Sequence, residues 1–392
     1  MPNLCRWMKF CLGSKNGLDP TPTRRRVILM PLLLAASVTV SGCQPETPVQ
    51  LAFLGSFSGK GADLGESGRN GALLAIEDAN ANGGIAGRDV ELLVYDDQQD
   101  PNTALRALET IAKQDIKLII GPMTSSVAEA IYPALQRLEL FAISPTVTAS
   151  TLHGQTDRFF TIASPTQRNS QVSANKLYQQ GARRVAIIYD TNNRAFSQDW
   201  ADHYRQYFTA AGGKVVALLA YDGSQSGSFG HLIEQAKRAE ADSLMLVSGA
   251  VDTVRLVQLA RKEGDPSWHI VASSWAVTEH LIQLGGRSVE GVWMTQFFNR
   301  EHQAARYRDF SVRYQQRFRQ DPGFASVTAY DATQAIIQAL RQKSPQQTLD
   351  HALLHTGPYT GLQAEWTFDR HGDANRPTFL TIVKNGRFEL FP

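Results

Sequence analysis

Small hydroxyl-bearing residues follow two consecutive apolar runs of the chain. Ser125 and Ser126 come soon after Leu118–Ile120, and residues 144–148 (Ser-Pro-Thr-Val-Thr) end the next run. In a parallel α/β sheet, the carboxyl ends of strands and the amino ends of helices line the ligand crevice, and a helix amino end favours an anion. The pattern predicts a site for a ligand carboxylate or a similar polar group. The alternative is that Ser125, Ser126 and Thr148 only cap helices.

The segment between these two runs has the pattern of a helix. Ser126 and Glu129 have the S-x-x-E spacing of a capping box, which marks a helix amino end. Ala130, Ala134 and Leu138 repeat at four-residue intervals and would form its apolar stripe. We therefore expect a strand, a helix and a second strand in this order, with the hydroxyl groups on the ligand side of the sheet.

Motifs for catalysis and metal binding are absent from the sequence. The nine His residues include no H-E-x-x-H spacing, and there is neither a C-x-x-C nor a G-x-S-x-G motif. The glycine-rich segment 55–61 is one residue short of a P-loop and has no Ser or Thr after Lys60. Asp96 and Asp97 could form a carboxylate pair, but capping and loop roles at a strand end are the simpler interpretation. We predict that the protein is not an enzyme and uses no metal or other cofactor.

The composition is that of a globular protein with a nearly balanced charge. The 392 residues are 43% hydrophobic and 19% charged, and the formal net charge is +2. This length is enough for two or three domains, and the charge gives no indication of nucleic-acid binding. Lys60, Arg88 and the pair Arg183-Arg184 are expected on solvated faces.

Residues 1–42 have the features of a signal peptide with an amino-terminal extension. Three arginines at positions 24–26 precede fourteen mostly apolar residues, Val27 to Val40. This run is shorter than the ~20 residues that a membrane-spanning helix needs, and it fits the apolar centre of a signal peptide.

The end of this segment, Val40-Ser41-Gly42-Cys43, resembles a bacterial lipobox. The resemblance implies cleavage before Cys43 and attachment of lipid to its sulfur, with residues 43–48 as a lipid-anchored tether. The alternative is an ordinary secretory signal followed by a chance cysteine. Gln44, rather than Asp, resembles the residue that directs lipoproteins to the outer membrane in bacteria that have one.

Strands and helices alternate along the rest of the chain, which predicts βαβ units and mostly parallel sheets. The number of strands is too high for one compact sheet, so we expect two α/β lobes. The expected strands are 49–55, 90–95, 118–120, 140–143, 185–189, 215–220, 244–247, 270–272, 292–296, 362–368, 379–383 and 388–391. The expected helices are 65–82, 100–114, 125–138, 167–180, 197–211, 230–239, 253–263, 302–319 and 326–341.

Several of these segments resemble the periplasmic leucine-isoleucine-valine-binding proteins, from about Val49 to the carboxyl terminus. The similar segments are 53–61, 70–72, 77–80, 83–88, 95–101, 120–126 and 144–146. The resemblance implies the type I periplasmic binding protein fold, in which two Rossmann-like lobes are joined by a three-strand hinge and close on a ligand. It implies a lobe 1 of residues 49–164 plus 296–378, and a lobe 2 of residues 165–295 plus 379–392.

The resemblance also implies a binding site. Ser125 falls where the family uses a hydroxyl group on the ligand carboxylate, and Ser126 lies beside it. Thr146 and Thr148 fall where the family uses a backbone group and a Thr side chain on the same carboxylate. Leu64 falls at a position that usually packs on the ligand side chain, with an ordinary surface loop as the alternative.

The chain departs from the family where lobe 2 would contact the ligand. A family Tyr is replaced by Arg194, or by Phe196 with a small shift, and a second Tyr is replaced by Gly249. The Glu that holds the ligand ammonium group is replaced by Ser274, beside Trp275. An unpaired buried charge is costly, so we expect leucine, isoleucine and valine to bind weakly. The alternatives are that Arg194 points to solvent, and that Asp190 or Glu279 supplies the missing charge.

These observations predict a solute-binding protein on the periplasmic face of a bacterial membrane, anchored by lipid. It would close on a small polar ligand (an amino acid, an amide or a carboxylate) and deliver it to an ABC permease. The rival hypothesis is a ligand-sensing subunit of a membrane receptor or signalling partner.

The lipobox leads to a direct prediction about Cys43. Stable attachment needs two or more lipid chains, and Cys43→Ser removes the atom that would carry them. We expect this variant to be released from the membrane or to accumulate unprocessed, as measured by cell fractionation and mass spectrometry. A processed variant that stays with the membrane like the parent would show that the lipobox interpretation is wrong.

Overall fold

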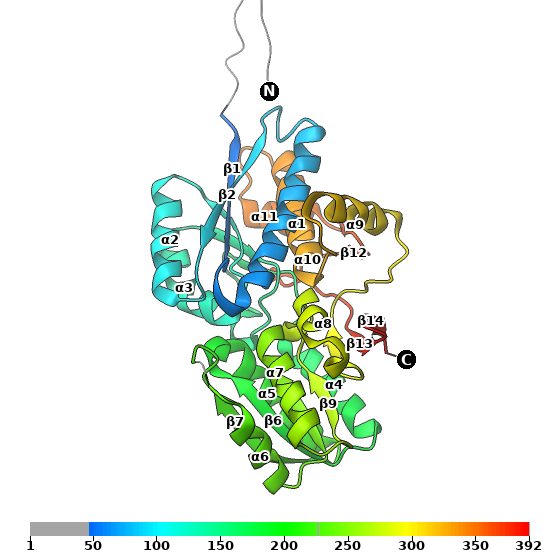
Figure 1. Cartoon of the computed structure of the whole chain (residues 1–392). Helices are drawn as coiled ribbons and strands as arrows, with labels where there is room; N and C mark the ends of the chain where they lie inside the picture. Colours follow the sequence, from blue (N-terminus) through cyan, green and yellow to red (C-terminus); the bar gives the residue numbers. More distant parts are fainter. Residues whose placement is uncertain (1–46, 226, 392) are drawn as a thin grey trace, which may run out of the picture. The chain divides into compact units, whose positions relative to one another are not determined.

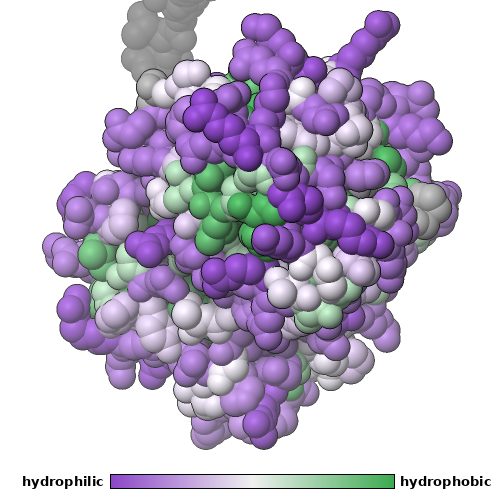
Figure 2. Space-filling model, turned by 90° about the horizontal axis from the view of Figure 1, so that it is seen from below, coloured by the Kyte–Doolittle hydropathy of each residue, from purple (hydrophilic) through white to green (hydrophobic). Residues whose placement is uncertain are grey.

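The computed structural model describes residues 47–225 and 227–391. The predicted signal peptide and the lipidation site at Cys43 lie outside these residues, so both stay predictions. Within the described part of the chain, no helix is both long enough and apolar enough to cross a membrane. The face shown in Figure 2 is mostly hydrophilic, with a small group of hydrophobic residues near its centre.

Five parallel strands form the sheet of the first lobe, in the order β2-β1-β3-β4-β5. Its interior strand β1 is buried from Leu51 to Gly55, as expected for a parallel strand that is covered on both faces. The strands are β1 (Val49–Gly55), β2 (Val90–Asp96), β3 (Leu118–Ile120), β4 (Phe141–Ser144) and β5 (Phe159–Thr161). The intervening helices are α1 (Ala62–Ala81), α2 (Pro101–Lys113) and α3 (Ser125–Arg137), with the 3₁₀ helices η1 (Gly59–Gly61) and η2 (Ser150–Leu152).

A second segment, which follows the other lobe in sequence, completes the first lobe (Figure 1). Helix α10 packs along α1, and Tyr330 of α10 donates a hydrogen bond to Asp78 of α1 at 2.6 Å. The buried pair Arg376–Asp331, at 2.7 Å, ties the end of this segment to α10. Its elements are α9 (Ala305–Phe318), α10 (Phe324–Gln342), α11 (Leu349–Thr356), β11 (Tyr359–Thr360) and β12 (Glu365–Trp366).

Seven strands form the sheet of the second lobe, in the order β14-β13-β10-β9-β8-β6-β7. All pairs are parallel except those of β13, which runs antiparallel to β10 and β14. The strands are β6 (Arg184–Asp190), β7 (Lys214–Tyr221), β8 (Ser243–Val247), β9 (His269–Ala272), β10 (Trp293–Gln296), β13 (Phe379–Lys384) and β14 (Arg387–Leu390). The helices are α4 (Thr166–Gln179), α5 (Arg194–Ala210), α6 (Gly230–Arg238), α7 (Ala250–Glu263), α8 (Glu279–Gly285) and the 3₁₀ helices η3 (Thr191–Asn193), η4 (Ser274–Ala276) and η5 (Gly286–Val289).

The predicted fold class is confirmed: the described residues form two α/β lobes with mostly parallel sheets. We use lobe 1 for the five-stranded sheet with its helices, and lobe 2 for the seven-stranded sheet with its helices. The chain passes between them after β5, after β10 and before β13.

The strand expected at residues 362–368 is reduced to β12. Leu362, Trp366 and Phe368 are buried, as their alternation suggested. The backbone, however, turns at Gly361, whose N–H donates to the oxygen of Ala364 at 3.0 Å. The N–H of Leu362 donates to the buried Asp331 at 2.9 Å. The alternation of apolar residues therefore predicted correctly which side chains are buried. The backbone N–H groups of Gly361 and Leu362, however, bond within a turn and to a side chain, so no long strand forms.

The close approach of α1 and α10 depends on Gly71. A Cβ atom there would lie 2.0 Å from the backbone oxygen of Ser326. Alanine usually favours a helix over glycine by about 1 kcal/mol, but this contact forces the helices apart. We expect Gly71→Ala to lower the unfolding free energy by about 3 kcal/mol, as measured by chemical denaturation.

Gly227→Ala is the matched control, because its added methyl group would meet open space. If Gly71→Ala were as stable as this control, the two helices would have to pack less tightly than the structure shows.

Candidate ligand site between the lobes

The loops at the carboxyl ends of both sheets meet between the lobes and enclose a small cavity. This cavity, here called the inner pocket, measures about 20 Å³, which is room for about one water molecule. Its lining contains hydroxyl and aromatic side chains from both lobes. The lining residues are Leu64, Met123, Thr124, Ser125, Thr146, Asn193, Phe196, Ser274, Trp275, Phe297 and Phe324.

The amino end of α3 faces lobe 2 instead of being capped by its own residues. Thr124 occupies the N-cap position with an extended backbone, and within the described chain its side chain makes no capping hydrogen bond. The N–H of Ser126 donates to Oδ1 of Asn193 at 3.0 Å, and the N–H of Ala195 donates to Oγ of Ser126 at 3.0 Å. The first turn of α3 therefore bonds across the cleft.

The predicted capping box at Ser126 is wrong. Ser126 lies inside the first turn of α3, two residues after the N-cap position. Glu129 accepts a hydrogen bond from the Thr151 hydroxyl instead of reaching back to the helix start. The local spacing suggested a cap, but the tertiary structure gives both side chains other partners.

The hydroxyl groups of lobe 1 form a connected set beside the inner pocket. The N–H of Thr148 donates to Oγ of Ser125 at 3.4 Å, and Thr146 Oγ1 donates to the backbone oxygen of Met123 at 2.6 Å. The hydroxyl of Thr148 lies 2.9 Å from that of Thr166, where the chain enters lobe 2. Ser125 and Thr146 line the pocket, whereas Thr148 lies behind them and is 2% exposed.

Lobe 2 contributes an aromatic wall. The rings of Phe196 and Trp275 meet edge to face, with centroids 5.9 Å apart. Ser274 precedes Trp275 in η4, and both line the inner pocket. Gly249 lies on the other side of the indole, where a Cβ atom would be 3.5 Å from Cε2 of Trp275. Arg194 is exposed and lines neither this pocket nor the cavity described next.

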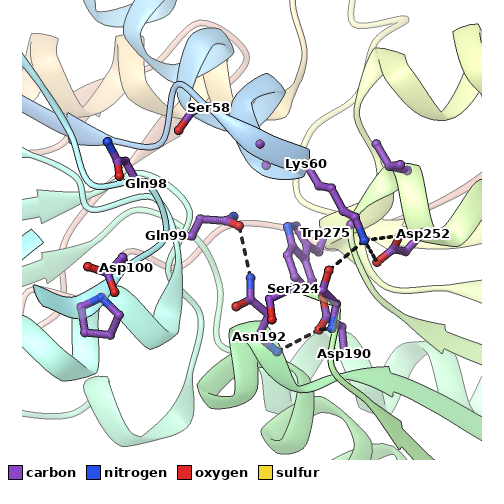
Figure 3. Close-up of a pocket in the computed structure, with 16 residues that line it drawn as sticks. Ser58, Lys60, Gln98, Gln99, Asp100, Asp190, Asn192, Ser224, Asp252 and Trp275 are labelled. Atoms are coloured by element: carbon purple, nitrogen blue, oxygen red, sulfur yellow. Dashed lines mark hydrogen bonds and ion pairs between the residues drawn. The ribbon is translucent and has the colours of Figure 1, made fainter. Parts of the chain in front are cut away.

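A larger cavity of about 580 Å³ lies beyond Trp275, and we call it the outer compartment (Figure 3). It lies between the strand-end loops of both lobes, and Trp275 belongs to its lining as well as to that of the inner pocket. The lining residues are Ser58, Gly59, Lys60, Gly61, Gln98, Gln99, Asp100, Pro101, Asp190, Asn192, Gly223, Ser224, Gly249, Val251, Asp252 and Trp275.

Lys60 crosses the outer compartment from lobe 1 to lobe 2 (Figure 3). Its Nζ donates to the oxygen of Gly223 at 2.8 Å and to the two carboxylate oxygens of Asp252 at 3.0 and 3.2 Å. The side chain of Asp252 is only 4% exposed. Lys60 is exposed, as expected, with 39% of its side chain accessible, but its ammonium group also pairs with a carboxylate of the other lobe.

Other polar contacts join the lobes around these cavities. The N–H of Ser150 donates to Oδ2 of Asp199 at 2.9 Å, and Thr278 donates to Oδ2 of Asp63 at 2.5 Å. Asn192 donates to Oε1 of Gln99 at 3.4 Å. The closed arrangement is thus held by several short contacts spread around the cleft.

Asp96 and Asp97 have the loop roles that seemed the simpler interpretation. Oδ1 of Asp97 accepts hydrogen bonds from Ser56 Oγ at 2.5 Å and from the N–H of Gln99 at 2.9 Å. Oδ1 of Asp96 accepts from the N–H of Phe57 at 3.0 Å. Burial raises the pKa of Asp97. Throughout residues 47–225 and 227–391, no group of three potential metal ligands comes together.

Six of the ten predicted ligand-binding residues line the inner pocket: Leu64, Ser125, Thr146, Phe196, Ser274 and Trp275. Ser126 and Thr148 adjoin it through hydrogen bonds, Gly249 lines the outer compartment, and Arg194 is exposed. Their role in binding stays a prediction.

The sequence reasoning missed Asn193 and the Lys60–Asp252 pair. Asn193 comes three residues after the end of β6, so the strand-end rule applied to lobe 2 would have selected it. The pairing of Lys60 with Asp252, 192 positions later in the chain, has no local signal.

Comparisons with known proteins agree with this architecture. A family model described as periplasmic binding protein matches residues 48–387. The Leu/Ile/Val-binding protein of Escherichia coli K12 is 24% identical over 330 residues, which are 83% of this chain and 88% of the relative.

Solved structures show the same fold. A leucine-binding protein of Thermotoga maritima superposes with a TM-score of 0.80 at 21% identity, covering 88% of this chain and 98% of that one. A solute-binding protein of an ABC transporter from Rhodopseudomonas palustris, in complex with benzoate, superposes with a TM-score of 0.78 at 14% identity, covering 88% of this chain and 95% of that one.

The Lys60–Asp252 pair leads to a prediction about lobe closure. Lys60→Met keeps the aliphatic stem but removes the ammonium group. A partly exposed ion pair contributes up to about 1 kcal/mol, so the ratio of closed to open molecules should fall roughly fivefold. Distances between spin labels at Lys113 of lobe 1 and Lys237 of lobe 2 would measure this ratio in the ligand-free protein.

Lys262→Met is the control, because Lys262 is exposed and its ion pair, among the described residues, is with its neighbour Glu263. If Lys60→Met gave the same distance distribution as the parent, the ion pair would not contribute to closure.

Proposed function

Because the chain belongs to the periplasmic binding protein family, we propose that it closes its lobes on a small carboxylate with an apolar body and delivers this ligand to an ABC importer. Family membership implies an extracytoplasmic location, and it confirms the prediction of a solute-binding protein that is not an enzyme. Attachment to the membrane through lipid on Cys43 belongs to this proposal.

The observation that supports the ligand class is the chemistry of the inner pocket. On one side lie the amino end of α3, whose N-cap residue makes no capping hydrogen bond among the described residues, and the hydroxyl groups of Ser125 and Thr146. On the other side lie the rings of Phe196 and Trp275. Among the described residues that line the pocket, none is charged. The helix end suits a carboxylate, and the rings suit an apolar body.

The hydrogen bond between Ser126 and Asn193 supports the position of the carboxylate. The amide oxygen of Asn193 accepts from an N–H at the helix start, so it takes the place that we assign to a ligand oxygen. Opening the lobes would free this N–H, and an incoming carboxylate would bind there more strongly than a neutral amide because it carries a full charge.

An α-amino acid fits this pocket less well than a plain carboxylate. Its ammonium group would lie next to its carboxylate, where the described lining provides hydroxyl groups but no opposite charge. Leaving a buried charge unpaired costs several kcal/mol. We therefore propose that leucine, isoleucine and valine are poor ligands, although relatives are named for binding them.

The names of the similar proteins favour an importer over a receptor as the partner. Structural neighbours are described as solute-binding proteins of ABC transporters, one of them in complex with benzoate and another with 3,4-dihydroxybenzoic acid. Both ligands are carboxylates on an aromatic ring, and benzoate, whose ring carries no other polar group, belongs to the class that we propose here.

Calorimetric titration with benzoate, hexanoate and leucine tests this proposal. We expect at least one of the two plain carboxylates to bind more tightly than leucine. Ser125→Ala removes a hydroxyl group from the carboxylate site, and hydrogen bonds to a charged group are worth roughly 1.5–3 kcal/mol. Binding should therefore weaken about tenfold or more.

Ser344→Ala, at an exposed serine far from both cavities in sequence, controls for the loss of a hydroxyl group. Submicromolar binding of leucine would contradict the proposed ligand class. Equal affinity of Ser125→Ala and the parent would remove Ser125 from the site.

A further inference from the structure

The outer compartment carries an excess of negative charge. Three carboxylates (Asp100, Asp190 and Asp252) and the ammonium group of Lys60 belong to its lining. Lys60 is paired with Asp252. Asp100 caps α2, because its Oδ1 accepts from the N–H and the hydroxyl of Thr103, both at 2.7 Å. Asp190 forms no ion pair among the described residues, and it caps the 3₁₀ helix η3 through Oδ1 alone.

The carboxylate of Asp190 is buried, and only one of its two oxygens accepts hydrogen bonds from the described residues. The residue is 5% exposed. Its Oδ1 accepts hydrogen bonds from the N–H groups of Asn192 and Gly223, both at 2.8 Å. Within the described chain, no donor reaches Oδ2. An anionic oxygen without a partner, at the wall of a cavity, is a place where a cation gains a strong interaction.

The absence of a side chain at residue 223 leaves room for the carboxylate of Asp190. A Cβ atom on Gly223 would lie 2.2 Å from Oδ2 of Asp190, so any other residue would displace the carboxylate. The same wall already holds one ammonium group, since the oxygen of Gly223 accepts from Nζ of Lys60 at 2.8 Å. The protein's own lysine shows that this surface suits a primary ammonium group.

Trp275 connects this compartment to the inner pocket. Its indole belongs to the lining of both cavities, and Gly249 beside it leaves the ring uncovered by a side chain on that side. A ligand that begins at the amino end of α3 can therefore continue along the indole toward Asp190. The apolar ring suits an uncharged spacer between two polar ends.

We propose that the outer compartment binds the cationic end of a ligand whose carboxylate lies at α3, so that the ligand is an ω-amino carboxylic acid. Its carboxylate and its ammonium group are separated by an apolar chain that lies along Trp275, and Asp190 pairs with the ammonium group. This inference rests on the proposed function only for the position of the ligand carboxylate at the amino end of α3. An α-amino acid with an uncharged side chain cannot reach both sites, because its ammonium and carboxylate groups are attached to the same carbon atom.

Three probes of one chain length separate the two ends in calorimetric titrations: hexanoate, 6-aminohexanoate and hexylamine. We expect 6-aminohexanoate to bind about tenfold or more tightly than hexanoate, as is typical of a gained charge-assisted hydrogen bond. The same comparison with chains of four to eight carbons would find the length that fits.

We call the ratio of the affinity for 6-aminohexanoate to the affinity for hexanoate the gain. Asp190→Asn should abolish this gain and leave the affinity for hexanoate within about twofold of that of the parent. The variant keeps an oxygen for the N–H groups of Asn192 and Gly223, so a merely structural role of Asp190 would leave the gain in place. Glu234→Gln, at an exposed residue of α6, makes the same charge change in lobe 2 and should leave the gain unchanged.

Ser224→Lys gives a second test that does not disturb Asp190. Ser224 is exposed at the compartment wall, and a lysine there would compete with the ligand amine. We expect Ser224→Lys to reduce the gain at least fivefold, and the uncharged Ser224→Gln to retain it.

The outcomes separate this inference from the proposed function. Equal affinity for hexanoate and 6-aminohexanoate overturns the cation site and leaves the carboxylate site intact. Binding of hexylamine without hexanoate supports the cation site and overturns the carboxylate site. If no chain length binds with either end group, both are overturned.

Discussion

Polar groups that face the space between the two lobes need partners when the lobes close, because a buried donor without a partner costs about 1–3 kcal/mol and a buried charge costs more. The closed structure meets this requirement with contacts from one lobe to the other. Asn193 accepts from the start of α3, Lys60 pairs with Asp252, and Asp199 accepts from Ser150. When the lobes are open, these polar groups would be hydrated. Closure therefore depends on matching donors with acceptors across the cleft.

The same requirement explains why the cleft is divided. The inner pocket combines a helix amino end with aromatic rings, and its described lining has no charged side chain. The outer compartment contains the charges, with Trp275 between the two. Under our proposal, a ligand places its carboxylate at the helix end in the first region and its cationic group at Oδ2 of Asp190 in the second. Selectivity would then come from the distance between the ligand's polar groups as much as from their identity.

Local patterns predicted much of the fold and part of the site. Apolar runs bounded by turn residues located most strands, since burial on both sheet faces requires continuous apolar sequence. The strand-end rule selected Ser125 and Thr146, which line the inner pocket. The same reasoning failed at Ser126, where a capping pattern was present but the side chain bonds to the backbone of Ala195. A local motif shows which bonds a residue can make, and the neighbours in space decide which bonds form.

The sequence by itself determined the alternation of strands and helices, the two α/β lobes and the hydroxyl groups at the strand ends, because these follow from periodicity and from residues close in the chain. Only the tertiary structure decided that Lys60 faces Asp252, that Asn193 meets α3, and that Gly223 lies against the carboxylate of Asp190. These contacts join residues that are 33 to 192 positions apart in the sequence. Their geometry depends on how two separately folded sheets present their loops to each other, and no local spacing encodes that.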